Sequence, residues 1–283
     1  MAQQLNGFKV MKIPVSRIQL KEITLRLMSI LLTGHVLFAS QNTLANGQTN
    51  RSQFVDVVFD LDSTLINPTT PELAASDPEG TVLVNQNLYR FTDHVVQIIA
   101  DLYAYPEVRI SFFSGGDSDR NHQIVKILYD QVHQKNPGVT PYRILSFDDL
   151  TVVSDDPTLS FSKRYKKDLS RFYNLSSTVL VDDNTQFAMP GQEGNLLWIG
   201  KVYRDIPRYE LINQMILSGS AMDAHLPPNK IEWKRERNKL ILAEELLIEA
   251  LHKAANGDLS FVDAIKVVQS QGRKCVELFS AAQ

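Results

Sequence analysis

Five short, almost entirely apolar runs recur between residues 54 and 200, and they limit the folds open to this chain. Turn-forming residues bound each run, and amphipathic stretches lie between them. A strand that is apolar along its whole length is buried on both faces, as in a parallel sheet covered by helices. The alternation therefore predicts an α/β fold with a doubly wound, mostly parallel five-stranded Rossmann-like sheet. The expected strands are FVDVVFD (54–60), VRISFFS (108–114), YRILSF (142–147), STVLVDD (177–183) and NLLWIG (195–200).

Apolar residues at helical spacing predict helices between these strands and after the last of them. The expected helices cover 92–105 (with Thr92 as N-cap), 119–134, 160–173, 231–257 and 259–272. Because the strand pattern stops near residue 205, we divide the chain into an α/β domain over 54–205 and a helical C-terminal extension over 206–283. The extension either packs on the core or makes a protein contact.

The N-terminal segment differs in character from the rest of the chain. Basic residues precede the apolar run LMSILLTGHVLFAS (27–40), and small residues follow near Ala45. This order is typical of a secretory signal peptide. The run is too short and too interrupted for a stable membrane span in the mature chain. We expect a signal peptide or targeting segment over 1–45, a linker over 46–53, and export to the periplasm or the medium. The alternative is a tail on a cytoplasmic protein.

Charge and cysteine content exclude some classes of function. The 283 residues carry a net charge of −3 with a pI of about 6.1, and no basic block supports nucleic-acid binding. The single cysteine, Cys275, cannot form an internal disulfide, and the six histidines show no metal-ligand spacing.

Polar residues follow three of the expected strands. Asp60 and Asp62 follow the first, Ser114 the second, and Asp182 and Asp183 the fourth. Ligands of open parallel sheets bind at these carboxyl ends, where the acids would converge. Several carboxylates cannot all be ionised in one pocket without a cation, and Mg²⁺ suits such an oxygen-rich site. With lysines some fifteen residues before Asp182, the site suits an oxygen-rich anion, and phosphate fits best.

The residues at these strand ends resemble the motifs of the haloacid dehalogenase (HAD) superfamily. DLDST (60–64) matches its DxDx[TS] motif, FFSGG (112–116) looks like its second motif, and VLVDD (179–183) like its fourth. The spacing in YKKDLSRFYNLSSTVLVDDN (165–184) is similar to that of the FCP/SCP phosphatases, the NLI-interacting-factor-like branch. The resemblance covers about residues 54–200. The Asp-Asp form of the fourth motif also occurs in other branches, including secreted acid phosphatases.

The resemblance implies a Mg²⁺-dependent phosphatase with a role for each motif residue. Asp60 would be the nucleophile that forms an aspartyl-phosphate, and Asp62 the general acid and base. Lys167 would balance charge, since it directly precedes Asp-Leu, with Lys163 and Lys166 as alternatives. The remaining implied roles are phosphate binding and loop support by Thr64, Ser114 and Gly115, and metal binding by Asp60, Asp62 (through its backbone carbonyl), Asp182 and Asp183.

The substrate depends on how the site is covered. Residues 65–90 have room only for a flap or a short hairpin, so the cap is minimal. An open site admits a phosphorylated serine or threonine of a protein, and small phosphomonoesters such as nucleotides are the alternative. A different class of function is a non-catalytic FCP/SCP-like peptide-binding module. Such a module is expected to lose motif acids, and all of them are present here.

Overall fold

The computed structural model describes residues 54–78, 80–204, 206–219, 225–271 and 277–278, which belong to one compact unit, Ser52–Gln283. The predicted signal peptide (1–45), the predicted linker (46–53) and Cys275 lie outside the described residues. None of the helices described is both long and apolar enough to cross a membrane.

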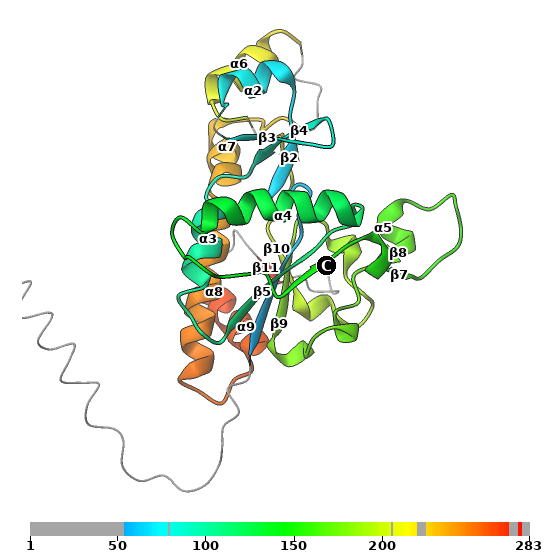
Figure 1. Ribbon diagram of the computed structural model, residues 1–283, viewed down its shortest axis with the longest axis vertical. Helices are drawn as coiled ribbons and strands as arrows, with labels where there is room; N and C mark the ends of the chain where they lie inside the picture. The colour runs from blue at the N-terminus through cyan, green and yellow to red at the C-terminus, as the bar shows by residue number, and fades with distance from the viewer. Residues whose placement is uncertain (1–53, 79, 205, 220–224, 272–276, 279–283) are drawn as a thin grey trace, which may run out of the picture. The chain divides into compact units, whose positions relative to one another are not determined.

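A six-stranded sheet forms the centre of the unit (Figure 1). Its order is β11-β10-β9-β1-β5-β6, and β11 is the antiparallel edge. The other five strands are parallel, which confirms the predicted α/β architecture. The strands are β1 (Val55–Phe59), β5 (Val108–Phe113), β6 (Arg143–Leu145), β9 (Thr178–Asp182), β10 (Leu196–Trp198) and β11 (Glu277–Leu278).

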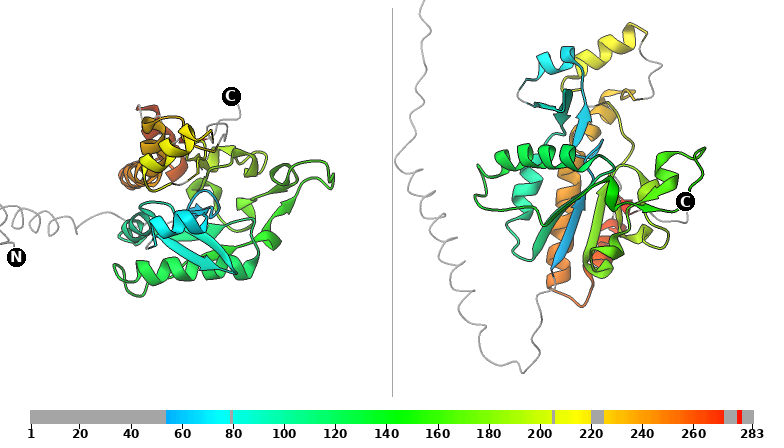
Figure 2. Two further views of the ribbon diagram at one scale, coloured as in Figure 1. Left: turned by 90° about the horizontal axis from the view of Figure 1, so that it is seen from above. Right: turned by 45° about the vertical axis from the view of Figure 1, so that its right-hand side comes forward.

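The two faces of the sheet are covered differently. Alternate residues of β1, among them Val57 and Phe59, join a core built by the longer helices. Figure 2 shows the ribbons of these helices beside the sheet. Val58 points to the other face and packs with Phe113 and Leu180 against the segment between β6 and β9. That segment is mostly irregular, so long helices contribute to only one of the two cores. The helices of the first core are α3 (Val95–Leu102), α4 (Ser118–Val132), α8 (Lys239–Ala255) and α9 (Phe261–Ser270).

The helix predicted over 160–173 is wrong, and the chain there is mostly extended. Only one helical turn forms before the backbone pairs with a neighbouring strand and then with the segment at Phe187. The Lys167 amide donates to the Phe187 carbonyl at 2.9 Å. Pairing of the backbone with other segments therefore outweighs the local helical pattern. The elements are β7 (Thr151–Val152), α5 (Phe161–Arg164), β8 (Tyr165–Lys166) and the 3₁₀ turns η1 (Phe147–Asp149), η2 (Leu169–Arg171), η3 (Leu175–Ser177), η4 (Thr185–Phe187) and η5 (Glu193–Asn195).

Two other predicted helices differ at their ends or in their continuity. Thr92 does not cap α3, because its hydroxyl accepts a hydrogen bond from Asn67 at 3.3 Å and the helix begins after His94. The helix predicted over 231–257 is broken at Asn238 into α7 (Lys230–Arg237) and α8. The helix predicted over 259–272 is α9, and Ser260 caps it as its side chain accepts from the Asp263 amide.

A small flap follows β1 and lies beyond its carboxyl end (Figure 1). It is an antiparallel sheet of order β2-β4-β3 with one short helix. Asn85 and Gln86 both have positive φ and form the tight β3–β4 turn. Tyr209 and Trp233 from the C-terminal extension pack in one cluster with Leu73 of the flap helix. The elements are β2 (Ile66–Pro68), α2 (Pro71–Ser76), β3 (Thr81–Val84), β4 (Asn87–Phe91) and α6 (Tyr209–Leu217).

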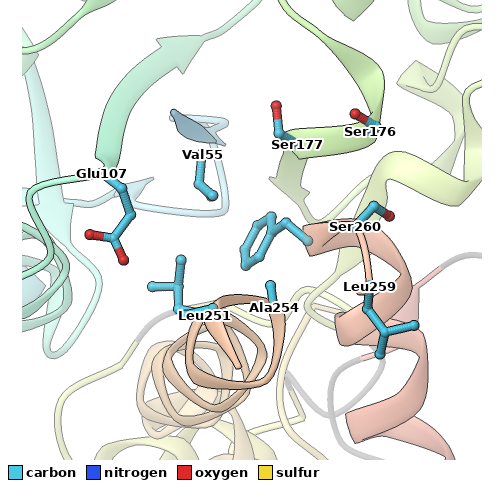
Figure 3. A pocket seen from close by; sticks show the side chains of 10 residues that line it. Val55, Glu107, Ser176, Ser177, Leu251, Ala254, Leu259 and Ser260 are labelled. Atoms are coloured by element: carbon cyan, nitrogen blue, oxygen red, sulfur yellow. The ribbon is translucent and has the colours of Figure 1, made fainter. Parts of the chain in front are cut away.

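The opposite end of the sheet holds a separate small cavity. It has a volume of about 200 Å³ and lies where the α8–α9 hairpin meets the beginnings of β1 and β9. Val55, Ser177 and Leu251 line it (Figure 3). The motif acids follow the other ends of β1 and β9, so this cavity is not part of the site described below.

Candidate active site

Parallel pairing brings the polar ends of three central strands together. β1 pairs with β9 on one side and β5 on the other, and Phe59 lies level with Val181 of β9. Asp60, directly after β1, therefore lies beside Asp182 at the end of β9. Ser114 follows β5 at the same edge. All three of these polar side chains are buried.

Lys167 bridges two of the acids. Its side chain is fully buried, and its Nζ donates to Asp60 Oδ1 and to Asp182 Oδ2, both at 2.7 Å. Lys166 instead donates to backbone carbonyls, among them that of Ser162 at 2.9 Å. Lys163 is exposed. Of the three lysines that the sequence offers, Lys167 is the one that reaches the acids.

Burial and mutual repulsion shift the ionisation of this cluster. Burial raises the pKa of Asp60 well above its usual range, against the pull of Lys167. Burial alone would lower the pKa of Lys167, but Asp182 and Asp60 raise it above its usual value. Burial raises the pKa of Asp183 to about 7, with a further rise from Asp182 and an opposing effect from Lys239 and Lys167. Burial and the neighbouring carboxylates therefore disfavour the charged forms of Asp60 and Asp183, and a bound cation would favour them.

The acids at the strand ends fit a hard cation. Asp60, Asp182 and Asp183 each offer a carboxylate oxygen, and these oxygens lie within 4.8 Å of one another. Asp182 already uses both oxygens, one with Lys167 and one with the Asn184 amide at 2.7 Å. Among the described residues, no donor occupies Asp60 Oδ2. Carboxylate oxygens gathered in this way are the ligands that Mg²⁺ prefers in proteins.

The carboxylate of Asp62 lies apart from that group. Its Oδ2 accepts from Ser114 Oγ at 2.9 Å and from Arg120 Nη1 at 3.1 Å, and its Oδ1 pairs with Arg120 Nη2. The Arg120 guanidinium also lies over the Tyr89 ring of β4, 5.0 Å from its centroid. The metal role predicted for Asp62 therefore rests on its backbone carbonyl.

Arg120 is a site residue that the sequence analysis missed. It occupies the first turn of α4, after the N-cap Asp117, and its side chain turns back toward the end of β5. A Cβ at Gly116 would collide with the Arg120 guanidinium, so the second glycine of FFSGG makes room for it. An arginine six residues after Ser114, in the first turn of a predicted helix, is the signal that could have found it.

Thr64 supports the site through its hydrogen bonds with Asp183. It is fully buried, and its Oγ1 donates to Asp183 Oδ1 at 3.3 Å and accepts from the Asp183 amide at 3.2 Å. It does not line the cavity, so the substrate-binding role predicted for Thr64 does not match its position. The contacts instead suit the predicted support of the loop.

A cavity of about 390 Å³ opens above the acids, lined by Asp60, Asp62, Ser114, Gly115, Gly116, Arg120, Asp183 and Asn184 with Phe161 and Phe187. Gly115, predicted to bind substrate, lies under the Phe161 ring. A Cβ at Gly115 would come within 2.9 Å of that ring. Phe161 is 42% exposed and stacks on Phe147, which is also exposed. One wall of the mouth is therefore aromatic, and the other carries Arg120.

Comparisons with known proteins find distant structural similarity and no match in sequence. No protein-family model matches the chain, and no curated protein matches it in sequence. Among solved structures, it is similar to an arginine-to-alanine variant of the fission yeast RNA polymerase II CTD phosphatase Fcp1 bound to beryllium fluoride. The identity is 16% and the TM-score 0.40, over 76% of this chain and 70% of that one. A second structure of Fcp1, described as an essential RNA polymerase II CTD phosphatase, matches at 15% identity with the same TM-score and coverage. The α/β architecture of the chain rests on the parallel pairing of its own central strands.

Proposed function

We propose that this chain is a Mg²⁺-dependent phosphomonoester hydrolase that acts through an aspartyl-phosphate on Asp60. The observation that carries the proposal is the buried Lys167, which contacts Asp60 and Asp182 at the ends of neighbouring strands. A fully buried lysine between two carboxylates is costly to maintain. Such a lysine is expected where the charge on a nucleophile and on an incoming anion must be balanced.

Asp60 is the nucleophile in this proposal. Lys167 holds its Oδ1, and the residue lines the cavity that would admit the phosphoryl group of a substrate. The P–O bond to the leaving alcohol breaks as the Asp60–P bond forms. Water then hydrolyses the aspartyl-phosphate and returns the carboxylate. Positioning and charge neutralisation supply most of the rate, because a carboxylate is a weak nucleophile.

Asp62 transfers the protons. It would protonate the leaving oxygen in the first step and take a proton from water in the second. Ser114 and Arg120 hold it toward the cavity. A bound phosphoryl group competes for both donors, so Ser114 and Arg120 are shared between the substrate and Asp62.

Asp60 and Asp183, with the backbone carbonyl of Asp62, would hold the Mg²⁺, and Asp182, whose two oxygens already have partners, would ligate it or orient its waters. When bound, the cation offsets negative charge on the phosphoryl oxygens. Thr64 keeps Asp183 in position.

The substrate class rests on how open the site is. The flap β2-β4-β3 and the short pair β7–β8 are the only sheets inserted beside the site in the described chain, and neither is a separate cap domain. A phosphorylated serine or threonine side chain of a protein can enter such a mouth. A small phosphomonoester, such as a nucleotide, is the second candidate, which the aromatic wall at Phe161 supports. A peptide-binding module without catalysis has less support, because every motif acid is present.

The test is hydrolysis of an aryl phosphate by the full chain, with and without Mg²⁺, at about pH 5 to 8. Asp60→Asn keeps the shape of the side chain and removes its charge. Asp130→Asn, in an exposed ion pair of α4 with Lys126, is the matched control. Metal-dependent turnover that is lost in Asp60→Asn alone supports the proposal. No turnover across that pH range, or equal turnover in both variants, contradicts it.

Export is a separate part of the proposal and rests on the sequence of residues 1–45 alone. Sequencing the N-terminus of the protein recovered from the periplasm or the medium tests it. We expect a new N-terminus near Ala45.

A further inference from the structure

The C-terminal extension reaches the active-site turn through one buried lysine. Lys239 is the first residue of α8 and is 2% exposed. Its Nζ donates to the backbone carbonyl of Ser63 at 2.7 Å, across 176 positions of sequence, and to Glu236 Oε1 at 2.7 Å. Glu236 belongs to α7 and is also buried. The break between α7 and α8 at Asn238 thus brings an acid and a base together under the turn that follows β1.

The turn that Lys239 contacts is the stretch of backbone that positions the acids proposed for catalysis. Ser63 lies between Asp62 and Thr64 and has a φ of +66°, a left-handed conformation that a serine adopts only under constraint. Its amide donates to the Ile66 carbonyl at 2.7 Å, and its carbonyl accepts from Lys239. Both polar groups of the Ser63 backbone are therefore held, one by the turn itself and one by the extension.

Lys239 differs from Lys167 in the groups that it contacts, although the charge of each also opposes the rise in the pKa of Asp183. Lys167 contacts two acids of the site, whereas Lys239 contacts its own carboxylate, Glu236. A buried ion pair contributes little net stability compared with apolar residues of the same size. What this pair provides is a fixed, well-oriented donor to one backbone carbonyl.

We propose that Lys239 is a positioning residue of the active site, which holds the Asp62–Thr64 turn in its left-handed conformation. The inference rests on the proposed phosphatase function. If the turn relaxes, the Asp62 carboxylate moves relative to Ser114 and the support of Asp183 by Thr64 is lost. A displacement of about 1 Å in such a group lowers turnover by about 10²-fold. The C-terminal extension is then a working part of the site rather than a stabilising addition.

The test compares two variants that neutralise the pair in different ways. Glu236→Gln keeps the amine of Lys239 and its bond to Ser63, so kcat stays close to that of the unchanged protein. Glu236→Gln combined with Lys239→Met removes the donor without leaving a buried charge alone. In that double variant kcat falls about 10²-fold and KM changes little, since the loss is in the reacting geometry. Lys266→Met, in an exposed ion pair of α9, is the control for a lysine lost from the extension.

Hydrogen exchange gives a second readout that does not depend on turnover. The amides of Ser63, Leu65 and Ile66 donate within the turn at 2.7 to 2.9 Å. In the double variant they exchange faster than in Glu236→Gln, while amides within α8 and α9 are unchanged. A purely stabilising role would speed exchange in the helices and leave the kcat of the folded protein intact.

Each outcome bears on a different statement. Turnover by the double variant equal to that of Glu236→Gln, with equal exchange in the turn, overturns the inference. An equal loss of kcat in Glu236→Gln also overturns it, because the bond to Ser63 is kept there. If the wild-type protein itself shows no turnover, the proposed phosphatase function is contradicted. Hydrogen exchange of the three turn amides then decides whether Lys239 holds the turn.

Discussion

Replacing Lys167 by methionine removes the cation between Asp60 and Asp182 while keeping the volume of the side chain. Each ion pair has an N–O distance of 2.7 Å, which at an effective dielectric constant of about 20 corresponds to about 6 kcal/mol of attraction. Desolvation of the three buried charges offsets most of this, and breaking a buried pair costs about 3–5 kcal/mol of unfolding free energy. The same change removes charge stabilisation from the reacting phosphoryl group, which lowers kcat by about 10²- to 10³-fold.

The assay is urea unfolding and aryl phosphate turnover of Lys167→Met beside Lys166→Met. Lys166 is the adjacent lysine, and its Nζ contacts backbone carbonyls outside the acid cluster, so we expect it to keep near-normal kcat. The stability loss of Lys167→Met is smaller at about pH 5 than at about pH 8, because the stranded carboxylates then take up protons. Similar effects of the two substitutions, or full activity of Lys167→Met, would refute the assignment of Lys167.

Three further outcomes are expected. Burial and a hydrogen bond with Asp101 raise the pKa of Glu244 from 4.5 to about 7, so its contribution to stability is present below pH 4.5 and lost as the pH rises through 7. In urea unfolding at about pH 8, Glu244→Gln should therefore be more stable than the wild-type protein. The gain should be less than about 1 kcal/mol, because the group is half exposed, and it should be smaller still at about pH 5. Asp183 has a pKa of about 7 without metal, so Mg²⁺ must displace a proton from it to bind at low pH. The Mg²⁺ affinity measured by calorimetry should therefore fall about tenfold per pH unit below pH 7. An affinity that does not change with pH would exclude Asp183 as a ligand. Phe161→Ala should raise KM for an aryl phosphate about two- to tenfold and leave KM for glycerol phosphate unchanged, and equal effects on both substrates would count against an aromatic contact.

The sheet could be predicted from the sequence because most residues of the central strands are buried, so each run is almost entirely apolar. The acids could be placed at one edge because parallel strands end together. Asp60, Asp182 and Asp183 come from two strands, and the parallel pairing of β1 with β9 brings them to one place.

Contacts that depend on tertiary pairing could not be predicted in this way. The segment around Lys167 has a helical pattern, but its backbone pairs with Phe187, and nothing in the local sequence reports that partner. Arg120 reaches Asp62 from another element, and Lys239 reaches Ser63 from a helix 176 positions away. Threonine is a common helix cap, but the hydroxyl of Thr92 accepts a hydrogen bond from the side-chain amide of Asn67 in the flap instead.

The most direct test of the central claim is chemical trapping of the covalent intermediate. The full chain is mixed with radiolabelled aryl phosphate and Mg²⁺, quenched in acid within the first turnover, and digested to locate the label. We expect label on the peptide that carries Asp60, released by hydroxylamine as an acyl phosphate should be, and absent from Asp60→Asn. Label on a different residue, or steady turnover with no covalent label at any quench time, would contradict Asp60 as the nucleophile.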